Sequence, residues 1–201
     1  MSTTKKALLL IFTILLVDQA SKIYIKLNFA LGDHIDVFSW FQIYFIENNG
    51  MAFGMEIIGK LYLTLFRIAA VCGLAYFIYT LIKKQFRTGY ILSVSLLLAG
   101  AAGNIFDSLF YGLIFSHSSG QIATFMPESG GYASLFHGKV VDMLYFPIIK
   151  NGLGETIFFS PVFNIADSSI TIAVTIILIF FRKDLNESLE SKKTKNIESE
   201  K

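Results

Sequence analysis

The sequence predicts an all-α membrane bundle of four transmembrane helices that carries a small β-rich region at the membrane surface on its outer face. Of the 201 residues, 54% are hydrophobic and only 16% are charged. A soluble globular domain carries about 25% charged residues. In addition, four apolar stretches approach the ~20 residues that a helix needs to cross the hydrocarbon of a bilayer. We therefore expect residues 1–183 to form a single integral membrane domain.

The four apolar stretches cover about residues 7–27, 61–82, 89–110 and 158–181. The first resembles a signal peptide, because Lys5 and Lys6 precede it. No A-x-A-like cleavage site follows it, and no cysteine lies nearby for lipidation. We therefore expect this helix to be retained as a membrane span.

Lys and Arg residues gather at one set of helix ends, in the segments 5–6, 83–87 and 182–183. Short cytoplasmic segments of membrane proteins carry such an excess of positive charge. Both termini are therefore expected in the cytoplasm. The two long connections, 28–60 and 111–157, are then expected on the outer face.

Two further segments differ in character from the apolar stretches. Residues 36–46 are rich in aromatic side chains and extended in pattern, which predicts strands at the level of the lipid headgroups. Residues 184–201 mix Glu, Lys, Ser and Asn without an apolar stripe. Such a composition is typical of a disordered segment, here a cytoplasmic tail.

Charge and reactive side chains argue against several function classes. A net charge of +2, dispersed along the chain, gives no basis for a nucleic-acid partner, so we expect partners in the bilayer, membrane phospholipids among them. The single cysteine, Cys72, excludes an internal disulfide and is expected to be buried. The histidines His34, His117 and His137 lack the spacing of metal ligands, and no metal or other cofactor is predicted.

A layer of polar residues crosses three of the predicted spans at one depth. Ionisable groups inside a membrane are costly and indicate function by default. Counted at 1.5 Å per residue from the cytoplasmic ends, five residues lie roughly 17 to 27 Å into the membrane: Asp18, Lys22, Asn104, Asp107 and Asp167. Arg67 enters the second span at a similar level and could pair with one of the carboxylates. This coincidence of depth predicts one shared site in the outer third.

Each of these groups also has a local explanation. Asp18 and Lys22 have the i,i+4 spacing of an ordinary helical ion pair. Asp167 precedes an apolar run, as a helix N-cap does. The cost of each polar group at depth disfavours a separate explanation for every one of them.

A further carboxylate, Asp142, comes from the second outer connection, where it is flanked by apolar residues. If Asp142 folds down onto Asp167, two carboxylates meet in a poorly hydrated place, where like charges cannot both ionise. One then acts as a general base on water while the other, protonated, donates to the scissile carbonyl. This is the chemistry of an aspartic peptidase.

Five short blocks, in order along the chain, resemble the lipoprotein signal peptidase (signal peptidase II) family, which removes signal peptides from lipid-modified bacterial prolipoproteins. The blocks are DQASK at 18–22, NNGMAF at 48–53, GAAGNIFD at 100–107, VVDM at 140–143 and FNIADSSI at 163–170. Together they span nearly the whole chain.

The resemblance implies a role for each site residue. Asp142 and Asp167 are implied to be the catalytic dyad. The implied substrate-binding or supporting residues are Asp18, Lys22, Asn48, Gly50, Asn104, Asp107, Asn164 and Ala166. The implied substrate is a diacylglyceryl-modified prolipoprotein, cut just before its lipidated cysteine. The implied location is the bacterial inner membrane, with the site near the periplasmic face, and we expect the enzyme to be a monomer.

Two features depart from the family pattern. The third block is usually followed by arginine, and here that position is Ser108. The missing contact is either lost or supplied by another residue such as Arg67, Lys139 or Lys22. Residues 117–138 are interpreted as an insertion between the third and fourth blocks, which is either a lid over the site or a passive surface loop.

Rival functions explain fewer of these residues. A proton-coupled transporter or channel is the main alternative, but no ionisable residue continues toward the cytoplasm on the third and fourth spans. A serine-lysine peptidase is disfavoured because Ser21 and Lys22 are neighbours on different helix faces. A purely structural membrane protein leaves Asp142 unexplained.

Overall fold

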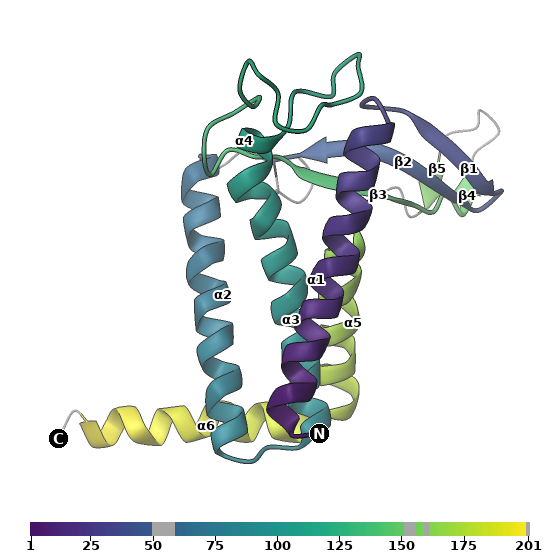
Figure 1. Ribbon diagram of the computed structural model, residues 1–201. Coiled ribbons are helices and arrows are strands. Elements are labelled where there is room, and N and C mark those ends of the chain that lie inside the picture. Colours follow the sequence, from purple (N-terminus) through teal and green to yellow (C-terminus); the bar gives the residue numbers. More distant parts are fainter. Residues whose placement is uncertain (50–58, 151–155, 159–160, 200–201) are drawn as a thin grey trace.

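The computed structural model of the protein describes residues 1–49, 59–150, 156–158 and 161–199 (Figure 1). Its helices are α1 (Thr3–Asn28), α2 (Lys60–Lys83), α3 (Thr88–Phe106), α4 (Gly112–Ile114), α5 (Ile165–Phe180) and α6 (Arg182–Ser199). The π-helical turn η2 (Asp107–Tyr111) joins α3 to α4. The strands are β1 (His34–Phe38), β2 (Phe41–Asn48), β3 (Val140–Tyr145), β4 (Ile149–Lys150) and β5 (Thr156–Phe158).

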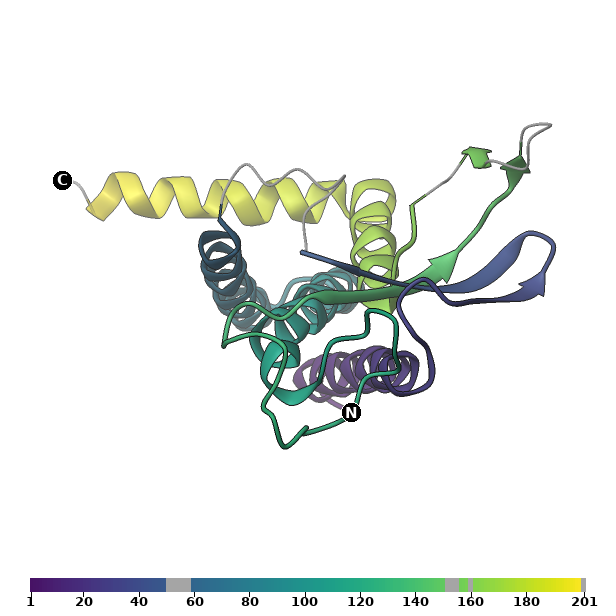
Figure 2. The same ribbon diagram turned by 90° about the horizontal axis from the view of Figure 1, so that it is seen from above.

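Four helices, α1, α2, α3 and α5, stand side by side, with the strands at one end of the bundle and α6 across the other (Figure 1). Seen from above, α3 lies among the other three (Figure 2) and packs against each of them. Among the described residues, α1, α2 and the continuous segment Thr88–Ile114 are long and apolar enough to cross a membrane. Helix α5 passes that test only together with the first part of α6, from which it bends by 90°. The sequence therefore predicted three spans closely, and the fourth is shorter than expected.

The predicted start of the fourth span, near residue 158, is wrong. Helix α5 begins at Ile165, because the Asn164 side chain caps its first turn by accepting a hydrogen bond from the backbone of Asp167. Residues 156–158 pair instead with β4. The apolar residues before Asn164 led to the prediction of a longer helix.

Small residues on α3 let its neighbours approach closely, as is common between membrane helices. A Cβ atom added at Gly100 would lie 2.4 Å from the carbonyl oxygen of Ala166 on α5. A Cβ atom added at Gly103 would lie 2.6 Å from Oδ2 of Asp18 on α1. These two positions bring three helices together at the depth of the polar layer.

The predicted strands form an antiparallel sheet at the end of the bundle opposite α6, in the order β1-β2-β3. The register of β2 on β3 shifts between Ile43 and Ile46, after which Ile46 lies opposite Asp142. Beneath this sheet a cluster of buried apolar residues joins it to α1 and η2, and it includes Ile25, Phe29, Phe45, Tyr111, Val141 and Met143.

The inserted segment 117–138 packs on the outer ends of the helices. The Ser118 carbonyl oxygen accepts a hydrogen bond from the backbone of Leu31 at 2.9 Å. Thr64 Oγ1 on α2 donates to the Phe136 carbonyl oxygen at 3.2 Å, and the Gly138 backbone donates to Ser108 at 2.9 Å. These bonds attach the segment to the bundle at both of its ends.

Two further expectations from the sequence differ from the structure. Residues 182–199 form helix α6, where the sequence suggested a disordered tail from 184. Its first turns are packed, because Asp184 Oδ2 pairs with Arg87 Nη2 at 2.5 Å and Ser188 bonds the Tyr90 hydroxyl at 3.0 Å. Cys72, expected to be buried, is exposed on α2, a helix whose outward face is apolar.

Candidate active site

Asp142 on β3 is buried, and both of its carboxyl oxygens have amide partners. Asn164 Nδ2 donates to Oδ1 at 2.6 Å, and Asn48 Nδ2 at the end of β2 donates to Oδ2. Burial, with a smaller contribution from the nearby Asp167 carboxyl, raises the pKa of Asp142 to about 8. The side chain therefore carries a proton at neutral pH.

Asp167 is held at the start of α5 by a capping box. The Asn164 Oδ1 atom accepts from the Asp167 backbone at 2.8 Å, and Asp167 Oδ2 accepts from the Asn164 backbone at 3.3 Å. The other oxygen, Oδ1, accepts from Asn104 Nδ2 at 2.7 Å. Asp167 thus has a local role at the helix start, at the third helical position rather than as the N-cap, and it also faces the shared polar layer.

Two asparagines connect the carboxyl groups of Asp142 and Asp167. Asn164 Nδ2 lies 3.0 Å from Asn104 Oδ1, in addition to its bond to Asp142. Lys22 Nζ donates to the same Asn104 oxygen at 2.9 Å. A continuous hydrogen-bonded path therefore runs from Asp142 through the two amides to Asp167.

Beneath this path lies a second buried group, the support cluster, which consists of Asp18, Gln19, Lys22 and Asp107. Lys22 Nζ lies 2.9 Å from Asp18 Oδ2 and 2.8 Å from Asp107 Oδ2, and all three side chains are at most 1% exposed. Asp18 Oδ1 accepts from the Ala166 backbone at 2.9 Å, which ties α1 to the first turn of α5. The cluster therefore holds together the elements next to Asp142 and Asp167.

Gln19 belongs to the support cluster but was not singled out from the sequence. Its Nε2 atom donates to Asp18 Oδ2 at 3.0 Å and to Asp107 Oδ1 at 2.9 Å. Its Oε1 atom accepts from the Tyr111 hydroxyl at 3.1 Å. The available signal was its place in the first block, as a polar residue at depth beside Asp18.

The structure thus brings together nearly all predicted site residues. Asn48, Asn104, Asn164 and the backbone of Ala166 contact the carboxylates as described, and the support cluster contains the rest. Gly50 lies outside the described residues. Within the described part of the chain, no three His, Cys, Asp or Glu side chains are grouped as metal ligands.

Ser108, which stands where the family pattern has arginine, is buried and bonds its own helix through the Asn104 carbonyl oxygen at 3.0 Å. Of the three replacement cations suggested by the sequence, Lys22 lies in the support cluster and Lys139 lies 3.7 Å from Glu47. Arg67 on α2 interacts electrostatically with Asp167. Arg67 is therefore the candidate cation beside a dyad carboxylate.

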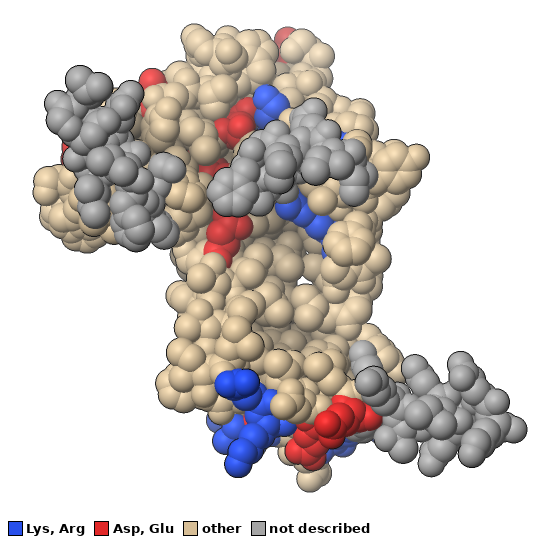
Figure 3. Space-filling view, turned by 180° about the vertical axis from the view of Figure 1, so that it is seen from behind, with Lys and Arg blue, Asp and Glu red and all other residues tan. Residues whose placement is uncertain are grey.

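Figure 3 shows the face of the molecule behind the view of Figure 1. Asp and Glu side chains gather there in the outer half, beside a hollow, with Lys and Arg side chains on its other side. Below them, Figure 3 shows no Lys, Arg, Asp or Glu side chain on this face until the end of the bundle opposite the sheet.

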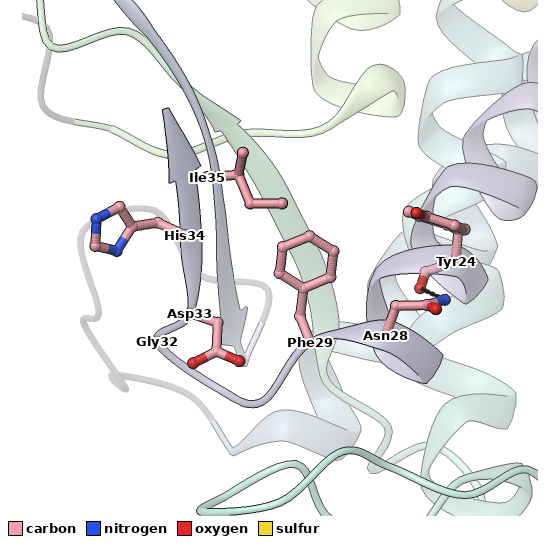
Figure 4. A pocket seen from close by; sticks show the side chains of 7 residues that line it. All are labelled: Tyr24, Asn28, Phe29, Gly32, Asp33, His34 and Ile35. Atoms are coloured by element: carbon pink, nitrogen blue, oxygen red, sulfur yellow. Dashed lines mark hydrogen bonds between the residues drawn. The ribbon is translucent and has the colours of Figure 1, made fainter. Parts of the chain in front are cut away.

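A separate pocket of about 750 Å³ lies in the angle between the outer end of α1 and β1 (Figure 4). Tyr24 and Asn28 line it from the helix, and Asp33 and His34 line it from the turn and strand. Neither Asp142 nor Asp167 lines this pocket, so it is distinct from the candidate catalytic cleft.

A family model described as signal peptidase (SPase) II matches residues 10–183, which is most of the chain and includes every block of the predicted site. The chain belongs to the signal peptidase II family. A lipoprotein signal peptidase of Porphyromonas gingivalis is 47% identical over 195 residues, covering 92% of this chain and 86% of the relative. One of Amoebophilus asiaticus is 31% identical over 189 residues, covering 87% and 76%.

A solved structure described as a bacterial membrane enzyme has a TM-score of 0.63 to this signal peptidase II family member, at 27% identity and with 91% of each chain covered. The family predicted from the five blocks is confirmed. The protein is therefore an aspartic-type peptidase of bacterial membranes that removes signal peptides from prolipoproteins. The transporter alternative is set aside.

Proposed function

We propose that Asp142 and Asp167 are the catalytic dyad and that the enzyme cuts diacylglyceryl-modified prolipoproteins just before the lipidated cysteine. One observation carries this proposal. Two carboxyl groups from separate elements, β3 and α5, are joined through Asn164 and Asn104, whose amide groups donate hydrogen bonds to them. A buried carboxyl beside a second carboxyl, as Asp142 is beside Asp167, retains a proton that chemistry can use.

The proton distribution follows from the environment of each group. Because its pKa is about 8, Asp142 enters the reaction protonated, and Asp167 acts as the general base. Asp167 takes a proton from water as the water oxygen attacks the scissile carbonyl carbon. Asp142 gives its proton to the carbonyl oxygen, which stabilises the tetrahedral intermediate.

Collapse of the intermediate breaks the carbon–nitrogen bond and restores the site. The carbonyl re-forms as its hydroxyl proton returns to Asp142. The leaving amine of the lipidated cysteine takes the proton held by Asp167. The new carboxyl terminus of the signal peptide and the free lipidated cysteine are the products, and both aspartates regain their starting states.

The membrane setting matches such a substrate. The Lys- and Arg-rich helix ends lie opposite the sheet, which supports cytoplasmic termini and a dyad near the periplasmic face of the inner membrane. A substrate held by two acyl chains and a signal helix presents its scissile bond near that interface. Asn48, beside Asp142, and Gly50 in the same block would shape the cleft, in a monomer surrounded by phospholipid.

The dyad is tested by replacing Asp142 or Asp167 with Asn and following cleavage of a lipidated prolipoprotein in detergent. Each replacement is expected to lower kcat on the order of 10³-fold or more. Asp33→Asn, which removes an outer carboxylate from the separate pocket, serves as the matched control and keeps the parent rate. A folded Asp142→Asn or Asp167→Asn enzyme that cleaves at the parent rate removes that residue from the dyad.

A further inference from the structure

A second buried ion pair lies outside the dyad and the support cluster, between Lys26 on α1 and Glu47 on β2. Lys26 Nζ is 2.5 Å from Glu47 Oε1, and the two side chains are 0% and 4% exposed. Neither residue belongs to the five blocks or takes part in the proposed chemistry. A buried ion pair at the end of a membrane span adds little to the free energy of unfolding.

The insertion encloses this pair. Ser118 Oγ lies 2.9 Å from Lys26 Nζ and 3.2 Å from Glu47 Oε1. The rings of Phe115, just before the insertion, and Tyr132, within it, lie 5.4 and 5.0 Å from the same nitrogen, within the range of cation–π attraction. Four side chains thus surround the Lys26 ammonium group.

Glu47 lies on the strand that also positions Asp142. Beyond the irregularity at Ile43 to Ile46, β2 pairs with β3 through only three residues, in which Glu47 lies opposite Val141 and Asn48 opposite Val140. Side chains alternate between the two faces of a strand. Lys26 therefore contacts this short segment of β2 on one face, through Glu47. Asn48, the amide donor to Asp142, lies on the opposite face.

The register of this segment has two separate anchors. The Val141 backbone donates to Asp107 Oδ2 at 3.3 Å, which attaches β3 to the support cluster. The Lys26–Glu47 pair attaches β2 to α1. A slip of one residue between the strands would turn Asn48 to the opposite face and away from Asp142. The irregularity isolates this segment from the remaining ladder, so the ladder alone does not prevent such a slip.

We propose that Lys26 and Glu47, closed over by Ser118 of the insertion, are positioning residues that fix the register of β2 on β3 and so place Asp142. A buried ion pair adds little net stability relative to an apolar pair, and the specification of register is its best-attested use. The insertion is then neither a lid nor a passive loop, since it completes the pair. This inference rests on the proposed role of Asp142.

The test uses the double variant Lys26→Met/Glu47→Leu in the full-length enzyme, because apolar replacement of both partners leaves no uncompensated charge. Thermal unfolding is expected to match the parent. We expect kcat to fall on the order of 10²-fold, as for a catalytic group misplaced by about 1 Å, with little change in KM. The alkaline limb of the kcat–pH profile moves to lower pH, because the pKa of Asp142 falls when the strands no longer exclude water from it.

Lys139→Met is the matched control. Lys139 also approaches Glu47, at 3.7 Å, but is 42% exposed and leaves the Lys26 pair intact. It is expected to keep the parent kcat and pH profile. If the double variant does not fold, Lys26→Met and Lys26→Arg replace it, with activity lost in the first and recovered in the second.

Parent values of kcat and of the alkaline limb in the folded double variant overturn the inference, as does a fully active Lys26→Met enzyme. A different result would overturn the assignment of Asp142 to the catalytic dyad. An active Asp142→Asn enzyme removes the catalytic role of Asp142, whereas an inactive Asp142→Asn enzyme beside a fully active double variant removes only the positioning role of Lys26 and Glu47.

Discussion

The dyad and the support cluster lie in the same outer layer of the bundle, yet their charges are arranged in opposite ways. In the support cluster, Lys22 lies between two carboxylates, at 2.9 and 2.8 Å, and is fully buried with them. Around the dyad, Asp142 and Asp167 accept hydrogen bonds from amide groups. Asp142 is as deeply buried as the support cluster, so burial alone does not identify a reactive site. Hydrogen bonds from amide side chains, in place of the lysine ion pairs of the support cluster, distinguish the dyad.

This difference separates two kinds of mutational effect. Removing one charge from a compensated cluster leaves its partners buried and unpaired, which destabilises the fold. Replacing a protonated carboxyl by an amide changes no charge, so it removes chemistry and leaves stability nearly unchanged. Variants of the two groups should therefore separate folding from catalysis.

The largest effect on stability is expected for Lys22→Met. It leaves Asp18 and Asp107 facing each other without a cation, at a cost of about 3–5 kcal/mol in the free energy of unfolding. Thermal unfolding in detergent measures this loss, with Asp142→Asn as the comparison that should unfold like the parent. Equal stability of Lys22→Met and the parent would break the distinction between the two groups.

A smaller loss is expected for Gly103→Ala on α3. The added methyl group would lie 2.6 Å from Asp18 Oδ2, so α1 must shift, which costs about 1–3 kcal/mol. Gly73→Ala on α2 is the matched control, because an added Cβ there has no heavy atom within 4 Å. The same unfolding assay serves for both, and a Gly103→Ala protein as stable as Gly73→Ala contradicts the close packing described here.

The pH dependence of cleavage gives a further test. Activity requires the proton on Asp142, whose pKa is about 8, so kcat/KM should be level below that value and fall as pH rises through it. Above the pKa the fall approaches about tenfold per pH unit. Initial rates on a lipidated substrate between pH 6 and 10 measure it, and a rate that stays level to the alkaline end is the contrary result.

The smallest effect is expected for Ser118→Ala in the insertion. It removes one hydroxyl partner from Lys26 but retains the Lys26–Glu47 ion pair. A single hydrogen bond to a charged group contributes about 1.5–3 kcal/mol at most, and the ion pair that remains limits the loss of position. We expect a fall in kcat of several-fold, well below that of the Lys26→Met/Glu47→Leu variant, in the same cleavage assay.

The sequence predicted the parts of the molecule that depend on local pattern. Apolar length located α1, α2 and α3 within a few residues, and the cost of polar groups at depth located Asp18, Lys22 and Asn104. The start of α5 was also encoded locally, since Asn164 is followed three residues later by Asp167, as in a capping box. The apolar residues before Asn164 concealed it.

Contacts between distant segments were beyond local pattern. The meeting of Asp142 with Asn48, 94 residues apart, depends on strand register, and only the chemistry of carboxyl pairs and the family blocks suggested the placement of Asp142. Lys26 was not singled out from the sequence. Its buried partner Glu47 lies across a turn and a strand, and nothing in the spacing reveals that the two side chains meet.

Asp142 is expected to hold a proton at neutral pH, because burial raises its pKa to about 8. Infrared spectroscopy of protein labelled with ¹³C-aspartate measures protonated carboxyl groups directly, without substrate. The account predicts a protonated-carboxyl band at pH 7 that disappears as pH rises through about 8 and is missing from Asp142→Asn. Absence of the band at pH 7, or its persistence in Asp142→Asn, would contradict the account.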